Sequence, residues 1–507
     1  MTSATPTESV AAEQPAPGTG RSSLILLNAV FRAIGDVGSK LATAVLALLV
    51  ARKAGASEFG VFSFAISFGG IAVTLGQFGQ EVVLIREVAR DPRRLERYYS
   101  DVLSSKLLLS VPVLLGALAV AALAGMQEHT LLVVALMGFG FVFDYVIGVP
   151  FAVFQAYERV GLIPIVLITQ RWVTTALAAL ALFSGRGVVA VAAIYCAGSL
   201  LAALFAGQLM FRKIARPRLR VHVRGALSVT REAIPIGLGL VAYLVLSRVD
   251  MTMLEMYKPS AEVGQYAAAY RLLETTAFVT WSVNTAVLPT MSRLSPTSEP
   301  TVGFVYARAL KLVLAITVPL AAGAAVLASP IIALLYGAEY HRAAEALVIL
   351  APTITLFPVS SLSCQLFYSQ DARRVVGLTY AAVLAQNVVW NLIMIPRYSL
   401  YGAAAGTSVS EILVACTLMV LSRRLHGRLQ ASRIVAGPLL GSAAAAAVMA
   451  ALSGSLALAA PLGVAGYLLV LLGFERIAFP DDLEVIAQFA ARLRYRGRAA
   501  SATTTNA

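Results

Sequence analysis

Residues 24–50 are long and apolar enough to cross a lipid bilayer as a helix, yet they carry three charges near their middle. Arg32, Asp36 and Lys40 follow one another at four-residue spacing, so they form one stripe on a helix. Three charges cost about 8–10 kcal/mol at the centre of a membrane helix, whereas the apolar neighbours return only about 6 kcal/mol. The stripe is therefore expected to face protein or a water-filled cavity.

The whole chain is unusually apolar for its length. Of its 507 residues, 59% are hydrophobic and 13% are charged, with a mean hydropathy of +0.79. A soluble domain would be about a quarter charged, so the composition indicates an integral membrane protein. The net charge of +14 does not indicate a nucleic-acid partner, because the basic residues lie in short segments between apolar stretches, which is a signal of membrane topology.

Apolar segments recur along the chain and predict an all-α integral membrane protein with about 14 transmembrane helices. The expected spans are 24–50, 59–84, 103–125, 131–154, 160–183, 187–211, 233–257, 263–289, 305–328, 347–369, 375–395, 402–422, 434–453 and 456–474. Residues 331–336 are a candidate bent or interfacial extension of the ninth span.

The distribution of Lys and Arg between the spans predicts the orientation. With the N-terminus in the cytoplasm, the cytoplasmic segments hold the two densest basic clusters, at 86–97 and 212–231. The opposite loops hold few basic residues: Arg52, Lys53, Arg186, Lys258, Arg342 and Arg397. Because cytoplasmic loops carry an excess of Lys and Arg, we expect both termini in the cytoplasm.

An internal repeat divides the predicted spans into two halves. Residues 57–62 (SEFGVF) resemble residues 261–266 (AEVGQY), which lie 204 residues later, and Lys106 before the third span resembles Lys311 before the ninth. The shared order predicts two pseudo-symmetric six-helix lobes around a central cavity, plus two extra C-terminal helices. The alternative is that Glu-x-Gly-x-aromatic recurs as an ordinary helix start.

These patterns give an expected division of the chain. Its parts are a disordered cytoplasmic tail (1–23), an N-lobe (24–211), a basic cytoplasmic linker (212–232), a C-lobe (233–422), the last two spans (434–474), and a cytoplasmic amphipathic helix with its tail (475–507). The last part carries apolar residues at helical spacing beside several arginines, which is typical of a helix on an anionic membrane surface. A plain solvated helix is the alternative.

Charged residues within the predicted spans are the candidate functional residues. An anion such as a diphosphate would be bound by the basic ones: Arg32, Lys40, Arg171, Arg248 and Arg271. The acidic candidates for proton transfer or Na⁺ binding are Asp36, Asp250 and Glu274. The structural alternative is that acids and bases, such as Arg271 and Glu274, neutralise each other and hold helices together.

Motifs of soluble enzymes are absent from the sequence. There is no GxxxxGK[ST] loop and no HExxH, the four His residues are scattered, and the three Cys residues lack metal-ligand spacing. We therefore expect no metal, no cofactor and no enzymatic activity. An intramembrane polysaccharide polymerase or ligase is an alternative, but it would usually show a large outer loop, and the longest one here is only residues 336–346.

Several segments resemble the Wzx-type polysaccharide flippases over roughly residues 24–425. They are 50–65 (VARKAGASEFGVFSFA), 79–90 (GQEVVLIREVAR), 248–250 (RVD), 262–272 (EVGQYAAAYRL), 287–289 (VLP) and 334–340 (LLYGAEY). The resemblance implies the fold of the multidrug/oligosaccharidyl-lipid/polysaccharide (MOP) exporters. It also implies movement of an undecaprenyl-diphosphate-linked oligosaccharide from the cytoplasmic to the outer leaflet of a bacterial inner membrane, for O-antigen, capsule or exopolysaccharide.

The same resemblance implies membrane lipids as surroundings, and a polysaccharide polymerase with chain-length machinery as protein partners. Two other functions within the superfamily remain open on the sequence. One is a flippase for the peptidoglycan lipid precursor, which would also use cavity arginines. The other is a drug/cation antiporter, which would favour an acidic, aromatic-lined pocket, whereas the candidates in this sequence are mainly basic.

Overall fold

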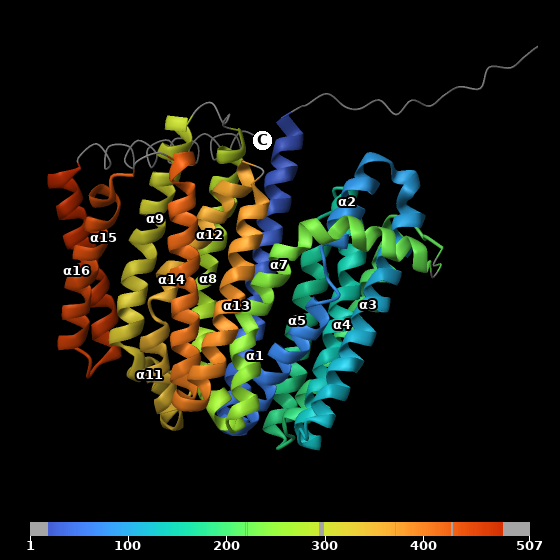
Figure 1. The fold of residues 1–507 in the computed structure, drawn as a ribbon, viewed down its shortest axis with the longest axis horizontal. Coiled ribbons are helices and arrows are strands. Elements are labelled where there is room, and N and C mark those ends of the chain that lie inside the picture. The colour runs from blue at the N-terminus through green and yellow to red at the C-terminus, as the bar shows by residue number, and fades with distance from the viewer. Residues whose placement is uncertain are drawn as a thin grey trace, which may run out of the picture.

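The structure is a computed structural model that describes residues 19–479, apart from 219, 221, 294–298, 371, 427 and 428. Every regular element in these residues is a helix, and no strand occurs among them (Figure 1). Ten of the described helices are long and apolar enough to cross a membrane, or eleven if one bent pair counts as a single span. The predicted all-α membrane fold is confirmed, but the number of fourteen spans is not.

The first half of the chain forms one group of packed helices. The first helix, α1 (Thr19–Thr74), covers two predicted spans and breaks at Gly55, whose φ of 81° suits glycine. The other elements of the group are α2 (Gln80–Arg90), η1 (Pro92–Arg94), α3 (Leu95–Leu123), α4 (Glu128–Ala156), α5 (Leu162–Phe183) and α6 (Val188–Lys213). Within this group α4 packs on α6, and α1 packs on α4 and α5.

The second half forms a second group. Its elements are α7 (Val223–Tyr257), α8 (Ser260–Arg293), α9 (Glu299–Val326), α10 (Ala328–Leu335), η2 (Ala338–Tyr340), α11 (His341–Leu350), α12 (Thr353–Ser369), α13 (Arg373–Tyr398) and α14 (Leu400–His426). The proposed extension of the ninth span is a separate short helix, α10. The last two helices, α15 (Ala431–Ala451) and α16 (Leu456–Ala478), pack on each other and on α9 at one edge of the bundle (Figure 1).

The largest apolar core lies between the two groups, where α1 packs against α8. It includes Phe59 from the second part of α1, Tyr266 from α8 and Tyr340 beside α11, all three with no exposed surface. The helix α11, which directly follows Tyr340, lies at the end of the bundle opposite the described chain ends (Figure 1). Burial of such large rings contributes strongly to holding the groups together at this end.

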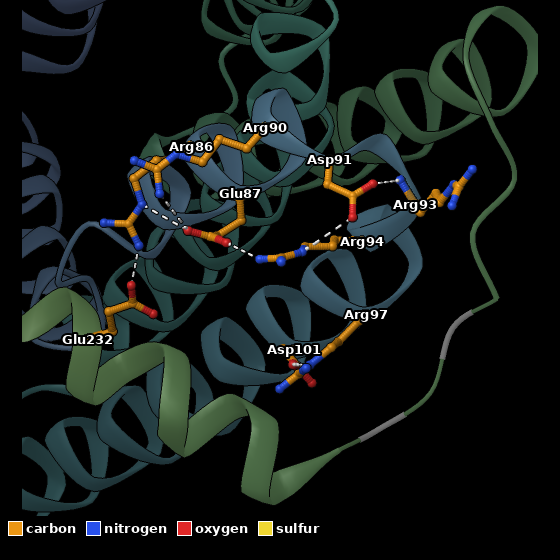
Figure 2. A network of polar contacts seen from close by, with 9 residues as sticks. All are labelled: Arg86, Glu87, Arg90, Asp91, Arg93, Arg94, Arg97, Asp101 and Glu232. Carbon is orange, nitrogen blue, oxygen red and sulfur yellow. Dashed lines mark hydrogen bonds and ion pairs between the residues drawn. The ribbon is translucent and has the colours of Figure 1, made fainter. Parts of the chain in front are cut away.

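Four arginines of the 86–97 cluster, Arg86, Arg90, Arg94 and Arg97, form ion pairs with carboxylates (Figure 2). The buried Glu87 carboxylate accepts hydrogen bonds from Arg86 Nε at 3.1 Å and Arg94 NH1 at 2.6 Å, and Arg90 lies 3.8 Å away. Arg86 also pairs with Glu232 of α7. These bonds, with the one from Arg86 first, lower the pKa of Glu87 below its ordinary value.

The predicted basic linker is partly helical, because α7 begins at Val223. Its start is held against α3, where the Asp101 carboxylate lies 3.1 Å from His222 Nδ1 and the hydroxyls of Ser105 and Thr230 are 2.7 Å apart. The later part of α7 packs on α13, with Gly239 facing Gly377. One helix therefore contacts both groups.

The two ends of the chain are described only in part. The helix α1 begins at Thr19, inside the expected tail 1–23, and residues 1–18 lie outside the described part. The helix α16 ends at Ala478, and most of the expected amphipathic segment 475–507 likewise lies outside it. The disorder of the first segment and the membrane binding of the second stay predictions.

Candidate functional site: a polar cavity in the C-terminal helix group

A cavity of about 200 Å³ lies within the second helix group. It is lined from α7, α8, α12, α13 and α14, and its ionisable side chains are Tyr243, Arg248, Asp250, Tyr270, Glu274 and Glu411. Pockets for small molecules usually measure about 300–1,000 Å³, so this one in its present shape has room only for a few waters or a small ion. A larger ligand requires the helices to separate.

Arg248 is the basic residue of the cavity lining. Its side chain also reaches the first helix group, because its Cδ and Cζ lie 3.3 and 3.6 Å from the place of a Cβ atom on Gly70 of α1. No hydrogen bond or ion pair joins the guanidinium to another side chain in the described part of the chain. A guanidinium at this depth calls for an anionic ligand or water as its partner, because an isolated charge inside a membrane is costly.

Asp250, two residues further along α7, is by contrast well supported by polar neighbours. Asn391 Nδ2 donates to its Oδ1 at 2.6 Å, and the hydroxyls of Tyr266 and Thr407 donate to its Oδ2, the former at 3.2 Å. Hydrogen bonds from several donors stabilise the charged form of a carboxylate. Asn391 Oδ1 is buried without a hydrogen-bond partner. The site therefore combines a carboxylate with an amide oxygen that has no hydrogen-bond partner, and both are ligand types that suit a small cation.

The other two carboxylates of the cavity differ in their partners. Glu274 lies 2.8 Å from Arg271 NH1, which is the pairing that the structural alternative described, so the two charges neutralise each other. Glu411 of α14 is 9% exposed and is hydrogen-bonded to Ser360 Oγ at 3.1 Å. The described lining thus holds one arginine and three carboxylates. The sequence led us to expect a mainly basic cavity, and the described cavity is not mainly basic.

Arg171 belongs to a different cluster, inside the first helix group. Its NH2 lies 2.8 Å from Asp144 Oδ2, which also accepts a 2.7 Å hydrogen bond from the Tyr195 hydroxyl. Gln170 donates to the other oxygen of Asp144 at 2.7 Å. This cluster joins α4, α5 and α6, which is the arrangement of the structural alternative considered for intramembrane charges.

The charged stripe of α1 is described only at its end. The side chains of Arg32 and Asp36 lie outside the described part, and Lys40 is exposed. Arg248, Asp250 and Glu274 are thus the predicted residues that the structure brings into one cavity, with Arg271 directly beside them. The contributions of Arg32, Asp36 and Lys40 stay predictions.

Sequence reasoning missed the residues that complete the cavity. Asn387 and Asn391 on α13 are four residues apart, as are Thr407 and Glu411 on α14, so each pair lies on one helix face. Polar pairs at this spacing inside apolar spans were the available signal. In the described part of the chain, no group of three or more His, Cys, Asp or Glu side chains could hold a metal ion.

The fold and the cavity together define a class, a multi-pass membrane protein with the architecture of the MOP-superfamily transporters. A family model described as "Polysaccharide biosynthesis protein" matches residues 25–295, which is more than half of the 507-residue chain. The chain belongs to this polysaccharide biosynthesis protein family, as the resemblance in its sequence predicted. Among curated protein sequences, none matches this chain.

Solved structures agree with the fold. A lipid II flippase MurJ in an inward closed conformation has a TM-score of 0.75 at 17% identity, covering 90% of this chain and 99% of its own. An inward-facing multidrug resistance MATE family transporter has a TM-score of 0.60 at 15% identity, covering 76% and 95%. A MOP superfamily transporter from Pyrococcus furiosus has a TM-score of 0.56 at 16% identity, covering 80% and 97%. At these identities the likeness shows the fold alone.

Proposed function

We propose that this protein is a flippase that moves undecaprenyl-diphosphate-linked oligosaccharides from the cytoplasmic to the outer leaflet of a bacterial inner membrane, for polysaccharide biosynthesis. Both termini lie in the cytoplasm, in keeping with the basic segments 86–97 and 212–231. Membership of the polysaccharide biosynthesis family supports the substrate class. The chain acts as a transporter without enzymatic chemistry, and its protein partners are the polymerase and chain-length machinery.

The single observation that carries the proposal is the position of Arg248. Its guanidinium lies in the cavity of the second helix group, touches Gly70 of the first, and has no described acidic partner within ion-pair distance. A guanidinium offers a planar fork of N–H donors that matches phosphate oxygens. A diphosphate that reaches this position between the two groups would therefore pair with this side chain. Arg271, Arg32, Lys40 and Arg171 remain further candidates.

The small volume of the cavity supports transport by alternating access. A space of about 200 Å³ cannot enclose a diphosphate with several sugars, since even drug-sized ligands need about 300–1,000 Å³. The two helix groups must therefore move apart to admit the polar head group, first on the cytoplasmic side and then on the outer side. The polyprenyl tail can remain in the lipid, because burying it inside the protein would gain little over hydrocarbon.

Binding alone drives no net transport, so we assign the coupling of an ion to the acidic side of the cavity. Asp250 is the main candidate, because its carboxylate is held in place by three donors beside the unpartnered oxygen of Asn391. Glu274 and Asp36 are the further candidates. A cation bound at Asp250 would also lower the repulsion between this carboxylate and an anionic head group near Arg248.

The test is made in cells that lack this protein. Undecaprenyl-linked oligosaccharides should accumulate on the cytoplasmic side, and wild type should remove them. With Arg248→Ala, made at normal levels, most of the lipid-linked oligosaccharide should stay on the cytoplasmic side. Arg212→Ala, a matched change of an exposed arginine, should act like wild type. If no lipid-linked oligosaccharide accumulates in the absence of the protein, the proposed substrate is wrong.

The acidic lining favours one second candidate, a drug/cation antiporter. Three carboxylates and three aromatic rings around the cavity (Tyr243, Tyr270 and Phe357) suit a cationic, aromatic substrate. Resistance of the same cells to cationic drugs separates the two functions. If the protein is an antiporter, cells that lack it should be more sensitive to cationic drugs and should accumulate no glycolipid. Accumulation of the peptidoglycan lipid precursor would instead point to a flippase for that lipid.

A further inference from the structure

Two glycines of the internal repeat touch the opposite copy of the repeat reciprocally. A Cβ atom on Gly60 of α1 would stand 1.7 Å from the carbonyl oxygen of Ser260, and one on Gly264 of α8 would stand 2.0 Å from the carbonyl oxygen of Ala56. Ala56 and Gly60 lie 204 residues before Ser260 and Gly264. The two contacts are therefore related by the same offset as the repeat, and they meet between the two helix groups. We call these four residues the glycine clasp.

The clasp is surrounded by a seal of side chains that also joins the two groups. The rings of Phe59, Tyr336 and Tyr340 have centroids 5.4–6.3 Å apart, and the Tyr340 hydroxyl donates to the Ala51 carbonyl oxygen at 3.1 Å. Arg52 donates to backbone carbonyls at the end of α10. The helix α11, which directly follows Tyr340, lies at the end of the bundle away from the described chain ends (Figure 1), which is the outer end in the orientation proposed above.

The chemistry of the clasp suits a contact that must close tightly and open again. At the clasp itself backbone meets backbone without side chains that interdigitate, so the apolar surface exposed on opening comes from the surrounding rings and not from the clasp. Any residue other than glycine at position 60 or 264 would bring a Cβ atom far inside van der Waals distance of a carbonyl oxygen. Closure therefore depends on glycine at both positions, whereas the separated state places no such demand on them.

We propose that the glycine clasp is the outer gate of the cavity, and that both of its contacts break when the cavity opens to the outside. The inference rests on the proposed function for the identity of what passes, but the gate itself is defined by the contacts of α1 with α8. A Cβ atom at either glycine would act as a wedge that opposes closure of the outer end. It would do so without touching the cavity residues.

The test uses a cysteine reporter in the cavity. Cys196, Cys364 and Cys416 are replaced by Ser, and Ser247→Cys or, separately, Thr276→Cys places a thiol on the cavity lining. Intact cells are treated from outside with a membrane-impermeant maleimide. With both glycines present we expect slow labelling. Gly60→Ala and Gly264→Ala should each raise the labelling rate about tenfold or more, because overpacking of a closed contact favours the state that relieves it.

Matched variants separate gating from general damage. Gly116→Ala on α3 adds the same methyl group where no atom lies within 4 Å, so it should leave labelling unchanged. Arg52→Ala weakens the seal from an exposed position without a steric clash, so it provides an opening variant even if the glycine variants fold poorly. It should raise labelling by a smaller factor. Retention of a monodisperse helical protein in detergent is measured for every variant.

The outcomes distinguish this gate from the proposed function. Faster labelling in the clasp and Arg52 variants supports the gate even if no glycolipid accumulates in cells that lack the protein. If both reporters are labelled equally in wild type, Gly60→Ala, Gly264→Ala and Arg52→Ala, the clasp is not a gate, whatever the protein transports. Faster labelling in Gly116→Ala as well would also overturn it, because the methyl group would then act without the clasp.

Discussion

Lys311 on α9 forms an ion pair with Glu475 on α16, with 2.6 Å between Nζ and Oε2. In the first half of the repeat the related Lys106 pairs with Glu81 of the same helix group. In the second half, the carboxylate that pairs with the lysine thus belongs to a helix outside the repeat. The last two helices are therefore bound to the transporter core by charge as well as by apolar packing with α9.

Because of this ion pair, we expect that removing one partner lowers the stability of the protein strongly. Lys311 and Glu475 have side chains only 17% and 6% exposed, so Glu475→Gln removes the negative charge that α16 places against a largely buried ammonium. We expect a loss of about 3–5 kcal/mol of unfolding free energy, measured by thermal or denaturant unfolding in detergent. Arg476→Gln, an exposed change on the same helix, should have little effect. Equal stability of Glu475→Gln and wild type would show that the pair does not hold α16.

Arg171 and Arg248 should respond differently to the same substitution. Arg171 is paired with Asp144 across α5 and α4, so Arg171→Ala strands a carboxylate inside the first helix group and should cost about 3–5 kcal/mol of stability. Arg248 has no described acidic partner, so Arg248→Ala should lose less stability and block export. Unfolding and glycolipid accumulation are measured on both variants. A stable but inactive Arg171→Ala protein would place Arg171 in the substrate path instead.

The contrast between these two arginines also shows which features could be predicted from the sequence. Hydropathy predicted the helical membrane fold because each span must satisfy its backbone hydrogen bonds within itself. Charged residues on neighbouring helices, such as Arg248 and Glu274, were predicted because charges inside spans are rare and costly. Whether such a charge is neutralised depends on which helices pack together, and neither hydropathy nor spacing within one helix specifies that α4 meets α5 at Asp144.

The number of spans and the full cavity were less predictable for related reasons. Two predicted spans lie on either side of the break at Gly55 within one kinked element, so the number of elements does not equal the number of spans. The cavity needs α13 and α14 beside α7, and only this packing brings Asn391 and Thr407 to Asp250. The two repeated segments also contact each other, since Gly60 and Gly264 each approach the opposite segment, and the sequence did not predict this contact.

Acid should weaken the attachment of α2 to its neighbours. The pKa of Glu87 is lowered in the folded protein, chiefly by the hydrogen bond from Arg86. Its stabilising contribution is therefore complete above the ordinary pKa of a glutamate and is lost as the pH falls through the lower folded value. Unfolding measured from about pH 6 downward should show this loss in wild type. Glu87→Gln should be less stable near neutral pH and should lack this part of the pH dependence.

A matched change shows whether that loss belongs to Glu87. Glu96→Gln alters an exposed carboxylate at the start of α3, and its pH dependence should follow that of wild type. Because Arg86 also pairs with Glu232, Glu232→Gln should remove only part of the network and give an intermediate curve. If Glu87→Gln and wild type lose stability in parallel as the pH falls, another carboxylate governs the acid response.

Asp250 should be needed for coupling but not for folding. Asp250→Asn keeps the size and most of the polar contacts of the side chain, yet it removes the negative charge that a cation requires. In proteoliposomes with lipid-linked oligosaccharide, an imposed proton or Na⁺ gradient should accelerate wild type by roughly 5–150-fold, the usual range of coupling between sites, and should leave Asp250→Asn unaffected. The two gradients are applied separately, so the same experiment identifies the ion.

Glu339→Gln, an exposed change in η2, should respond like wild type. Full stimulation of Asp250→Asn would move the coupling site to another carboxylate, with Glu274 and Glu411 in the same cavity as the next to be replaced.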